Sequence, residues 1–269
     1  MIALIDVSGF AYRSFYAFPS MKHNDQEVGA LYGFCSSMKN IIDKFKDFIF
    51  VAAMDYGKKT FRHDLYPEYK SNRKETPEQL INQIPLIQDA CNSFGFNVVK
   101  INGYEADDII ATYASKLPSN QKVVVISSDK DLMQLMSNNV SIYDPIKRSI
   151  ITQEDVVKKF GVTSDKILDF LSLVGDQSDN IPGIQGIGPK TAANLLNEFG
   201  SLENIVQNLT KLPKCKKFEK IKEDIDRARL SKKLATLITD LEVTLELRDI
   251  NVNGIKDFLA LYDFKSLLK

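Results

Sequence analysis

Short apolar runs separated by amphipathic segments form the pattern of the first half of the chain. Between these runs, apolar residues recur at helical spacing over residues 28–45 and again around residues 84–94. Strands that are apolar throughout and alternate with helices are typical of a parallel sheet covered on both faces. The pattern therefore predicts an α/β fold with a mainly parallel central sheet flanked by helices. The runs expected to form strands are residues 2–7, 48–54, 98–101 and 122–126.

Beyond residues 160–162 the pattern becomes wholly helical. Residues 165–174 form one predicted helix, and a glycine-rich stretch leads into another. We therefore expect an α/β domain over residues 1–161 and an all-helical subdomain over residues 162–269.

Carboxylates stand at the C-terminal end of every predicted strand. In parallel sheets these ends meet at one edge, which is where open α/β sheets bind their ligands. Grouped acids repel one another unless cations neutralise them, and oxygen ligands without histidine or cysteine favour magnesium or manganese over zinc. The sequence therefore predicts a metal centre at this edge. The residues concerned are Asp6, Asp55, Glu105, Asp107, Asp108, Asp129 and Asp131.

An ordinary structural explanation competes with the metal centre for single acids. A carboxylate at a strand end also forms turns or caps the next helix, and the helix macrodipole stabilises acids in a first helical turn. This alternative stays open for Asp6 taken alone and for residues 105–108 taken alone.

Basic and aromatic side chains interleave over residues 58–74, where apolar periodicity is absent. Lysine and arginine contact phosphates, while Phe61, Tyr66 and Tyr69 offer faces to unstacked bases, a combination expected for single-stranded nucleic acid. Acids such as Asp64 and Glu68 lie in the same segment, so a solvated loop is an equal alternative.

Two more carboxylates, Asp176 and Asp179, lie in a loop before the glycine-rich stretch. Glycines permit tight turns with exposed amides there, and the N-terminus of the helix that follows is an anion site. The spacing favours a phosphate-binding hairpin over a plain turn. A later basic run over residues 211–222 contains acids at helical spacing, which favours a solvated helix face over a DNA-contact patch and leaves the role of the run open. The hairpin residues are Gly183, Gly186, Gly188, Pro189 and Lys190.

Composition limits the remaining classes. A chain of 269 residues with 44% hydrophobic residues can bury a core, and no apolar run reaches membrane-spanning length. Three cysteines without CxxC spacing and only two histidines argue against a disulfide framework and a zinc site, and favour reduced thiols in a cytoplasmic protein. The formal net charge is zero, but acids gathered around cations would leave a basic exterior.

Taken together, these motifs closely resemble the flap endonuclease family, in particular the 5' nuclease domains of bacterial DNA polymerase I. The resemblance covers nearly the whole chain. The resemblance rests on these residues and motifs: Asp6; Asp55 followed by Phe61 and Arg62; the stretches at 69–73, 103–108 and 128–131; and the run from Gly175 to Lys190.

The resemblance implies hydrolysis of DNA phosphodiesters at 5' flaps and ends by two divalent ions, Mg²⁺ or Mn²⁺, in a PIN-like fold. Asp6, Asp55 and Asp107 would hold one ion, with Glu105 acting partly through water. Asp129, Asp131 and Asp179 would hold the other ion. Asp108 and Asp176 would lie in the outer coordination shell.

The resemblance also implies DNA contacts. A mobile helical arch over residues 58–78 would carry Lys70 and Arg73 to the scissile phosphate, with Arg62 binding DNA and Tyr69 stacking on the terminal base. A helix-hairpin-helix over residues 181–196 would grip the duplex backbone through Gly183, Gly186, Gly188 and Lys190, with a potassium ion between carbonyls and phosphate.

Two other functions remain open from the residues alone. One is a catalytically silent DNA-binding module whose acids hold structural metal, and the other is a PIN-like ribonuclease. As partners we expect branched or flapped DNA and no membrane. The chain is expected to be a monomer, and a polymerase domain on the same natural chain is a further partner that the resemblance implies.

Overall fold

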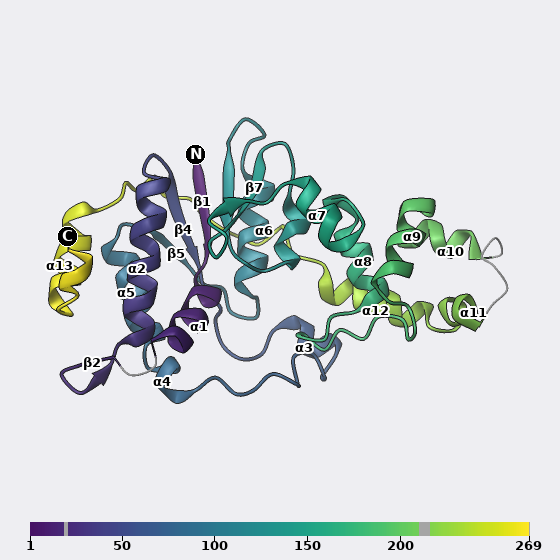
Figure 1. Ribbon diagram of the computed structural model, residues 1–269, viewed down its shortest axis with the longest axis horizontal. Coiled ribbons are helices and arrows are strands. Elements are labelled where there is room, and N and C mark those ends of the chain that lie inside the picture. The colour runs from purple at the N-terminus through teal and green to yellow at the C-terminus, as the bar shows by residue number, and fades with distance from the viewer. Residues whose placement is uncertain (19–20, 210–215, 269) are drawn as a thin grey trace.

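A computed structural model describes residues 1–18, 21–209 and 216–268 (Figure 1). The molecule is elongated, with a helix-covered sheet at one end and a group of helices at the other. None of the helices in these described ranges is long and apolar enough to cross a membrane.

The central sheet is mainly parallel, as predicted. Its strand order is β5-β4-β1-β6-β7-β8, and only the edge pair of β7 and β8 is antiparallel. All four predicted apolar runs form strands. The strands are β1 Ile2–Asp6, β4 Ile49–Ala53, β5 Asn97–Val99, β6 Val123–Ile126, β7 Val140–Asp144 and β8 Ser149–Ile150.

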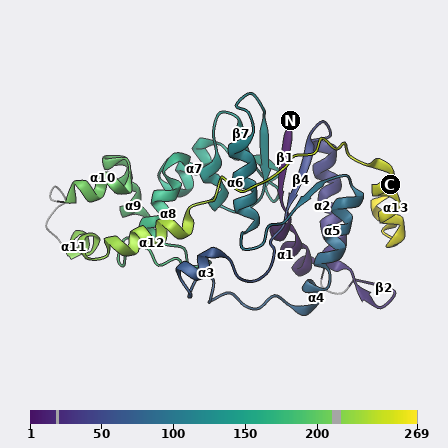
Figure 2. The same cartoon turned by 180° about the vertical axis from the view of Figure 1, so that it is seen from behind.

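The sheet separates two apolar clusters. Side chains alternate across a strand, so Ile2 and Leu4 of β1 face one cluster while Ala3 and Ile5 face the other. Helices α1, α2 and α5 cover the second face, and α6 covers the first (Figures 1 and 2). Their bounds are α1 Val7–Ala17, α2 Gly29–Lys44, α5 Ile84–Ser93 and α6 Ala106–Lys116.

The helical half shares its apolar core with the α6 face of the sheet. One continuous cluster contains Ile110 of α6 together with Leu173 of α8 and Leu196 of α9. The two halves are therefore packed on each other rather than joined by a linker alone. The helices of this half are α7 Gln153–Phe160, α8 Ile167–Val174, α9 Pro189–Phe199, α10 Leu202–Gln207, α11 Lys216–Glu223 and α12 Ile225–Ala235.

The C-terminal part of the chain returns to the sheet end of the molecule. After α12 an extended segment runs back along α6, and α13 (Val252–Leu261) packs beside α5 (Figure 2). Phe258 of α13 meets Phe94 edge-on, with ring centroids 6.0 Å apart. The prediction of one helical subdomain reaching residue 269 is therefore wrong for this last helix, whose amphipathic pattern does not reveal which face it covers.

Short elements complete the fold. A small hairpin, β2 Lys22–His23 and β3 Gln26–Glu27, follows α1, and α3 Phe61–Leu65 and α4 Glu78–Ile81 lie between β4 and α5. Cys35 and Cys91 are buried free thiols, in agreement with the prediction. Cys215 and the other residues of the basic run up to 215 lie outside the described residues.

Candidate active site

Asp6 and Asp129 meet at the C-terminal edge of the sheet. Asp6 ends β1 and is 9% exposed; its Oδ1 accepts a hydrogen bond from the Gly9 amide at 3.0 Å, so it also caps α1. Its Oδ2 accepts from the Ser127 hydroxyl at 2.9 Å, and the Ser127 oxygen accepts from the Asp129 amide at 3.0 Å. Ser127 thus ties the ends of β1 and β6 together. The sequence analysis did not single it out, although it directly follows the β6 run.

Asp55 and Asp107 join the same edge. The Asp55 carboxylate accepts from the Ala106 amide at 2.8 Å, which fixes the start of α6 against the end of β4. Burial raises the pKa of Asp107 well above its ordinary value, and the charges of Asp129 and Asp6 raise it further. Burial likewise raises the pKa of Asp6 to about 6, with the charges of Asp55 and Asp129 adding to the rise. The structure therefore brings these four acids within mutual electrostatic range.

Asp131 and Asp176 extend the cluster towards the helical half. Burial raises the pKa of Asp131 to about 7, with further rises from the charges of Asp129 and Asp176. Asp176 differs, since Lys130 forms an ion pair with it and the amides of Ser178 and Asp179 donate to it. These contacts outweigh its burial and hold the pKa of Asp176 below its ordinary value. The loop after α8 therefore carries its acids to the sheet edge.

The donor set fits hard divalent cations. In the described part of the chain, no three Asp, Glu, His or Cys side chains stand close enough to enclose a metal ion. Mg²⁺ needs no such cage, because it keeps several waters and is bound through one or two carboxylates. The Oδ1 atom of Asp131 is buried without a hydrogen-bond partner among the described residues, and the raised pKa values mark unneutralised negative charge. These pKa values are raised first by burial and then by neighbouring carboxylates, so a bound cation would favour the charged forms of Asp6 and Asp131.

Arg62 and Asp108 form a buried ion pair. Arg62 is 1% exposed, and its two terminal nitrogens each donate to an Asp108 oxygen at 2.7 Å. Asp108 is fully buried and also accepts from the backbone amides of Glu105 and Ile238. The burial of Arg62 leaves its guanidinium no access to DNA in this structure, so the expected DNA contact of Arg62 is not supported. Arg62 also lies 3.5 Å from a Glu105 oxygen, so Asp108 stays an outer-shell candidate that is linked to Glu105 through Arg62.

The segment over residues 58–78 is only partly helical. It contains α3 and the first residue of α4, and its other residues form turns and coil. Tyr69 is 3% exposed, its hydroxyl donates to Glu105 and Asp179 at 3.1 Å each, and its ring packs against His63. The ring therefore has no free face for a base, and the predicted stacking role of Tyr69 is wrong in this structure.

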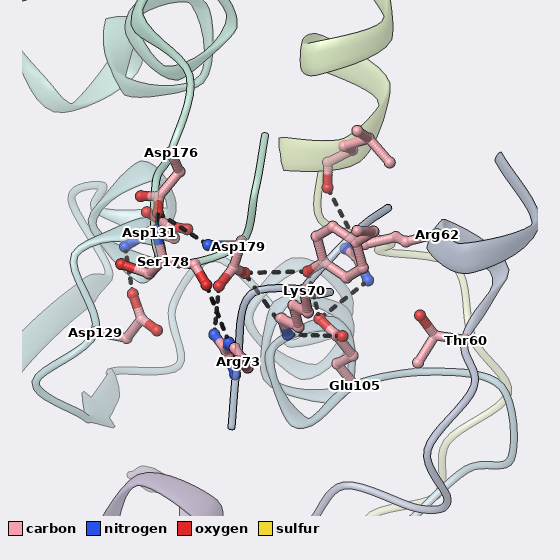
Figure 3. A network of polar contacts seen from close by, with 12 residues as sticks. Thr60, Arg62, Lys70, Arg73, Glu105, Asp129, Asp131, Asp176, Ser178 and Asp179 are labelled. Carbon is pink, nitrogen blue, oxygen red and sulfur yellow. Dashed lines mark hydrogen bonds and ion pairs between the residues drawn. The ribbon is translucent and has the colours of Figure 1, made fainter. Parts of the chain in front are cut away.

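Lys70 and Arg73 lie beside the acids, as Figure 3 shows. The Lys70 ammonium is 2.7 Å from Glu105 Oε1 and 3.6 Å from Asp179 Oδ2, and the Arg73 guanidinium forms an ion pair with the other Asp179 oxygen. The Asn180 side chain donates to the Glu68 carbonyl at 2.7 Å. The segment that carries the two cations is thus fastened to the loop that carries Asp179.

The glycine-rich hairpin joins α8 to α9 and has two different ends. Gly183 is buried, and its amide donates to the Ser231 hydroxyl at 2.9 Å, so the predicted DNA contact of Gly183 is wrong. Gly186 and Gly188 are exposed, and a methyl group built on either would meet no atom within 4 Å. Pro189 begins α9 as predicted, and Lys190 is exposed beside it.

A carboxylate-edged parallel sheet joined to a helical half with an open glycine hairpin defines an α/β nuclease. Residues 1–161 match the family described as 5'-3' exonuclease, N-terminal resolvase-like domain, and residues 162–257 match 5'-3' exonuclease, C-terminal SAM fold. The chain belongs to the 5'-3' exonuclease family and is therefore a hydrolase of nucleic acids.

Sequence relatives occur in two lengths. DNA polymerase I of Rhizobium leguminosarum is 41% identical over 281 residues, which cover 99% of this chain but 28% of the polymerase. The 5'-3' exonuclease of Aquifex aeolicus is 41% identical over 277 residues, which cover 99% of this chain and 93% of that protein. The chain thus spans under a third of one relative and nearly all of the other.

Solved structures share the fold at low sequence identity. The T5 5'-exonuclease with divalent zinc ions bound has a TM-score of 0.76 at 23% identity, covering 99% of this chain and 98% of that chain. The catalytic core of Rad2 in complex with DNA has a TM-score of 0.61 at 17% identity, covering 97% and 87%.

Proposed function

We propose that the chain is a divalent-metal-dependent, structure-specific 5' nuclease that hydrolyses DNA phosphodiesters at 5' flaps and ends in replication and repair. The observation that carries the proposal is the convergence of Asp6, Asp55, Asp107 and Asp129 from separate strands and a helix onto one edge. Structural neighbours with metal ions or DNA bound support it.

The acids divide between two ions. Asp6, Asp55 and Asp107 would hold one, with Glu105 acting partly through water, and Asp129, Asp131 and Asp179 would hold the other. Bound Mg²⁺ or Mn²⁺ supplies charge neutralisation and a water of lowered pKa. Asp176, which pairs with Lys130, would lie in the outer coordination shell.

The protein's own contacts hold this arrangement. Ser127 orients the carboxylate of Asp6 and the backbone of Asp129, and the Ala106 amide orients Asp55. Lys70 and Arg73 form ion pairs with Glu105 and Asp179 beside the cluster, so they would contact the scissile phosphate and stabilise its developing charge.

The helical half would position the duplex. Gly186 and Gly188 leave open space for a phosphate to approach the backbone at the start of α9, and Lys190 adds charge there, with a potassium ion completing the site. Phosphate contacts fix register without reading bases, so recognition would depend on DNA shape.

We propose the same division of labour for the two domains, residues 1–161 for chemistry and the helices after residue 161 for DNA binding. The bounds of the two family matches support it. The chain would act as a monomer, and its match to only 28% to 33% of the length of polymerase relatives supports a polymerase domain as a partner in cis.

The double variant Asp129→Asn with Asp131→Asn tests the proposal. Cleavage of a labelled 5'-flap duplex in Mg²⁺ should fall by about 10²-fold or more, because electrostatic stabilisation of the transition state is lost. Binding of the same duplex should persist. The matched control is Asp64→Asn, an exposed acid paired with Lys59, which should cleave normally.

The same assay separates the two alternatives. A silent DNA-binding module would show no metal-dependent cleavage in the wild-type chain. A ribonuclease would cleave single-stranded RNA in preference to the flap when the two compete. Either result would overturn the proposed function.

A further inference from the structure

The carboxylates of the site fall into two groups by their partners. Glu105 and Asp179 are covered by cations and a hydroxyl of this chain, whereas Asp6 and Asp129 accept only neutral donors. Lys70 reaches both covered carboxylates, and Tyr69 donates to both (Figure 3). Two of the acids proposed to serve the ions are thus neutralised by the protein itself.

These donors come from one short segment with a fixed backbone. Lys70 has a φ of 57°, in the left-handed region that residues with a Cβ adopt rarely. The Lys70 amide donates to the Asp179 carbonyl at 2.9 Å, and the Arg73 Nε donates to the Ser178 carbonyl at 3.3 Å. Backbone and side chains of the segment therefore point at the same loop, which makes the covering a built feature rather than a chance contact.

An ammonium 2.7 Å from the Glu105 Oε1 atom competes with a metal ion for that oxygen, because the two cations repel. The same conflict applies to Asp179 and Arg73.

We propose that Lys70 and Arg73 are internal counterions of the metal-free site, and that divalent ions displace them from Glu105 and Asp179. The inference rests on the proposed metal-dependent function. Displacement releases the two cations only when metal is present, so that contact with the scissile phosphate follows metal binding. Metal occupancy and phosphate recognition are thereby coupled through two side chains.

Amine acylation of the free chain measures the release directly. Lys70 has a side chain that is 19% exposed and ion-paired, so in EDTA it should react slowly with an N-hydroxysuccinimide ester, as read by mass spectrometry of its peptide. Saturating Mg²⁺, without DNA, should raise the rate several-fold. Lys59, in the same segment and 72% exposed, is the internal control and should not respond.

Metal affinity provides the second measurement. Free Mn²⁺ has an electron paramagnetic resonance signal that disappears on binding, so titration gives a dissociation constant without turnover. The Lys70→Met variant, which keeps the chain length and removes the charge, should bind Mn²⁺ several-fold more tightly than the wild-type protein. The Lys59→Met variant removes a charge from the same segment and should bind as the wild-type protein does.

The outcomes separate the inference from the proposed function. If Mn²⁺ binds and the flap is cleaved, but Lys70 reacts at the same rate with and without Mg²⁺, the proposed displacement of Lys70 by metal is wrong. The proposed nuclease function is unaffected by that result. If Lys70→Met binds Mn²⁺ no more tightly than Lys59→Met, the exchange is also wrong. If no metal binds and no flap is cleaved, both the proposed displacement and the proposed nuclease function are wrong.

Discussion

The ion pair of Arg62 and Asp108 joins three parts of the chain at one buried point. Arg62 comes from α3, Asp108 from the first turn of α6, and the Leu234 and Thr236 carbonyls, which Arg62 also contacts, from the end of α12. Its charges are shielded from water, so each depends on the other. The pair holds the segment with Lys70 against both halves of the molecule.

We predict that Arg62→Met lowers the free energy of unfolding by about 3–5 kcal/mol, because it leaves the Asp108 charge buried and unpaired. Urea denaturation followed by circular dichroism measures the change. The matched control is Arg229→Met, whose exposed pair with Asp226 should contribute about 0–1 kcal/mol. Equal effects of the two substitutions would contradict a structural role for Arg62.

The raised pKa values predict that the metal-free protein loses stability as pH rises. Folded Asp6 and Asp131 hold their protons to about pH 6 and about pH 7, whereas the ordinary value is 3.8, so unfolding releases protons in this window. The stabilisation that these two carboxyl groups contribute is fully present below about pH 4, and it is lost as the pH rises through about 6 and about 7. The lowered pKa of Asp176 acts only below the window.

Thermal unfolding in EDTA at pH 5 and pH 7.5 measures this loss. Asp131→Asn removes one of the two groups and should flatten the dependence, while Asp263→Asn, an exposed control, should leave it unchanged. Mg²⁺ should raise the melting temperature more at pH 7.5 than at pH 5, since it competes with protons. A melting temperature that rises with pH in EDTA, by contrast, would contradict the raised pKa values of Asp6 and Asp131.

Among single residues, the sequence predicted the gathering of acids but not their individual partners. Asp107 and Asp108 are neighbours in one run, yet a helix rotates them by about 100° relative to each other, so one faces the sheet edge and the other faces Arg62. The periodicity of the sequence does not identify Arg62, which lies 46 residues before Asp108, as the partner of Asp108. Ser127 was missed for the same reason, since its role depends on a contact between two strands.

At the scale of elements, the hairpin between α8 and α9 has one end that holds the fold and one that is free. Gly183 has a φ of 58°, and a Cβ there would lie 2.4 Å from the Gly175 nitrogen. Gly188 has ordinary backbone angles and open space around it. Gly183 is therefore required for packing of the hairpin, whereas Gly188 leaves space for a ligand.

We predict opposite effects of alanine at these two positions. Gly183→Ala should lower the free energy of unfolding by roughly 3 kcal/mol or more, since backbone atoms must move apart and the φ is unfavourable. Gly188→Ala should leave stability within about 0.5 kcal/mol and weaken binding of a DNA duplex, because its methyl group occupies the space of a phosphate. Denaturation and fluorescence anisotropy measure the two effects. Unchanged duplex affinity in Gly188→Ala would remove the hairpin from the interface.

The predictability of elements follows their burial. Continuous apolar runs identified β1, β4, β5 and β6, because both faces of these strands are covered. The strands β7 and β8 were not predicted, since Ser141 interrupts the apolar run of β7 and both residues of the edge strand β8 are exposed. The arch expected over residues 58–78 is only partly helical here, and Tyr69, which the sequence suggested as a free aromatic, is part of the core.

At the scale of the whole molecule, the zero net charge conceals a division of charge. Acids gather at the sheet edge, while the hairpin at the start of α9 presents Lys190 to solvent. The α9 end and the α13 end lie at opposite extremes of the long axis (Figure 1). DNA bound across the sheet edge and the hairpin would contact one extreme and leave the other free.

We predict that duplex affinity falls by about 10³-fold between 50 mM and 200 mM salt, as for proteins that make several phosphate contacts. Fluorescence anisotropy with the Asp129→Asn, Asp131→Asn variant measures it without cleavage. In that background Lys190→Ala should reduce the slope of log affinity against log salt by about one, because one phosphate contact is lost. Lys256→Ala, on exposed α13 at the other extreme, should leave the slope unchanged. Equal slopes for both variants would place the duplex elsewhere on the molecule, since only a residue in contact with phosphate changes the number of released counterions.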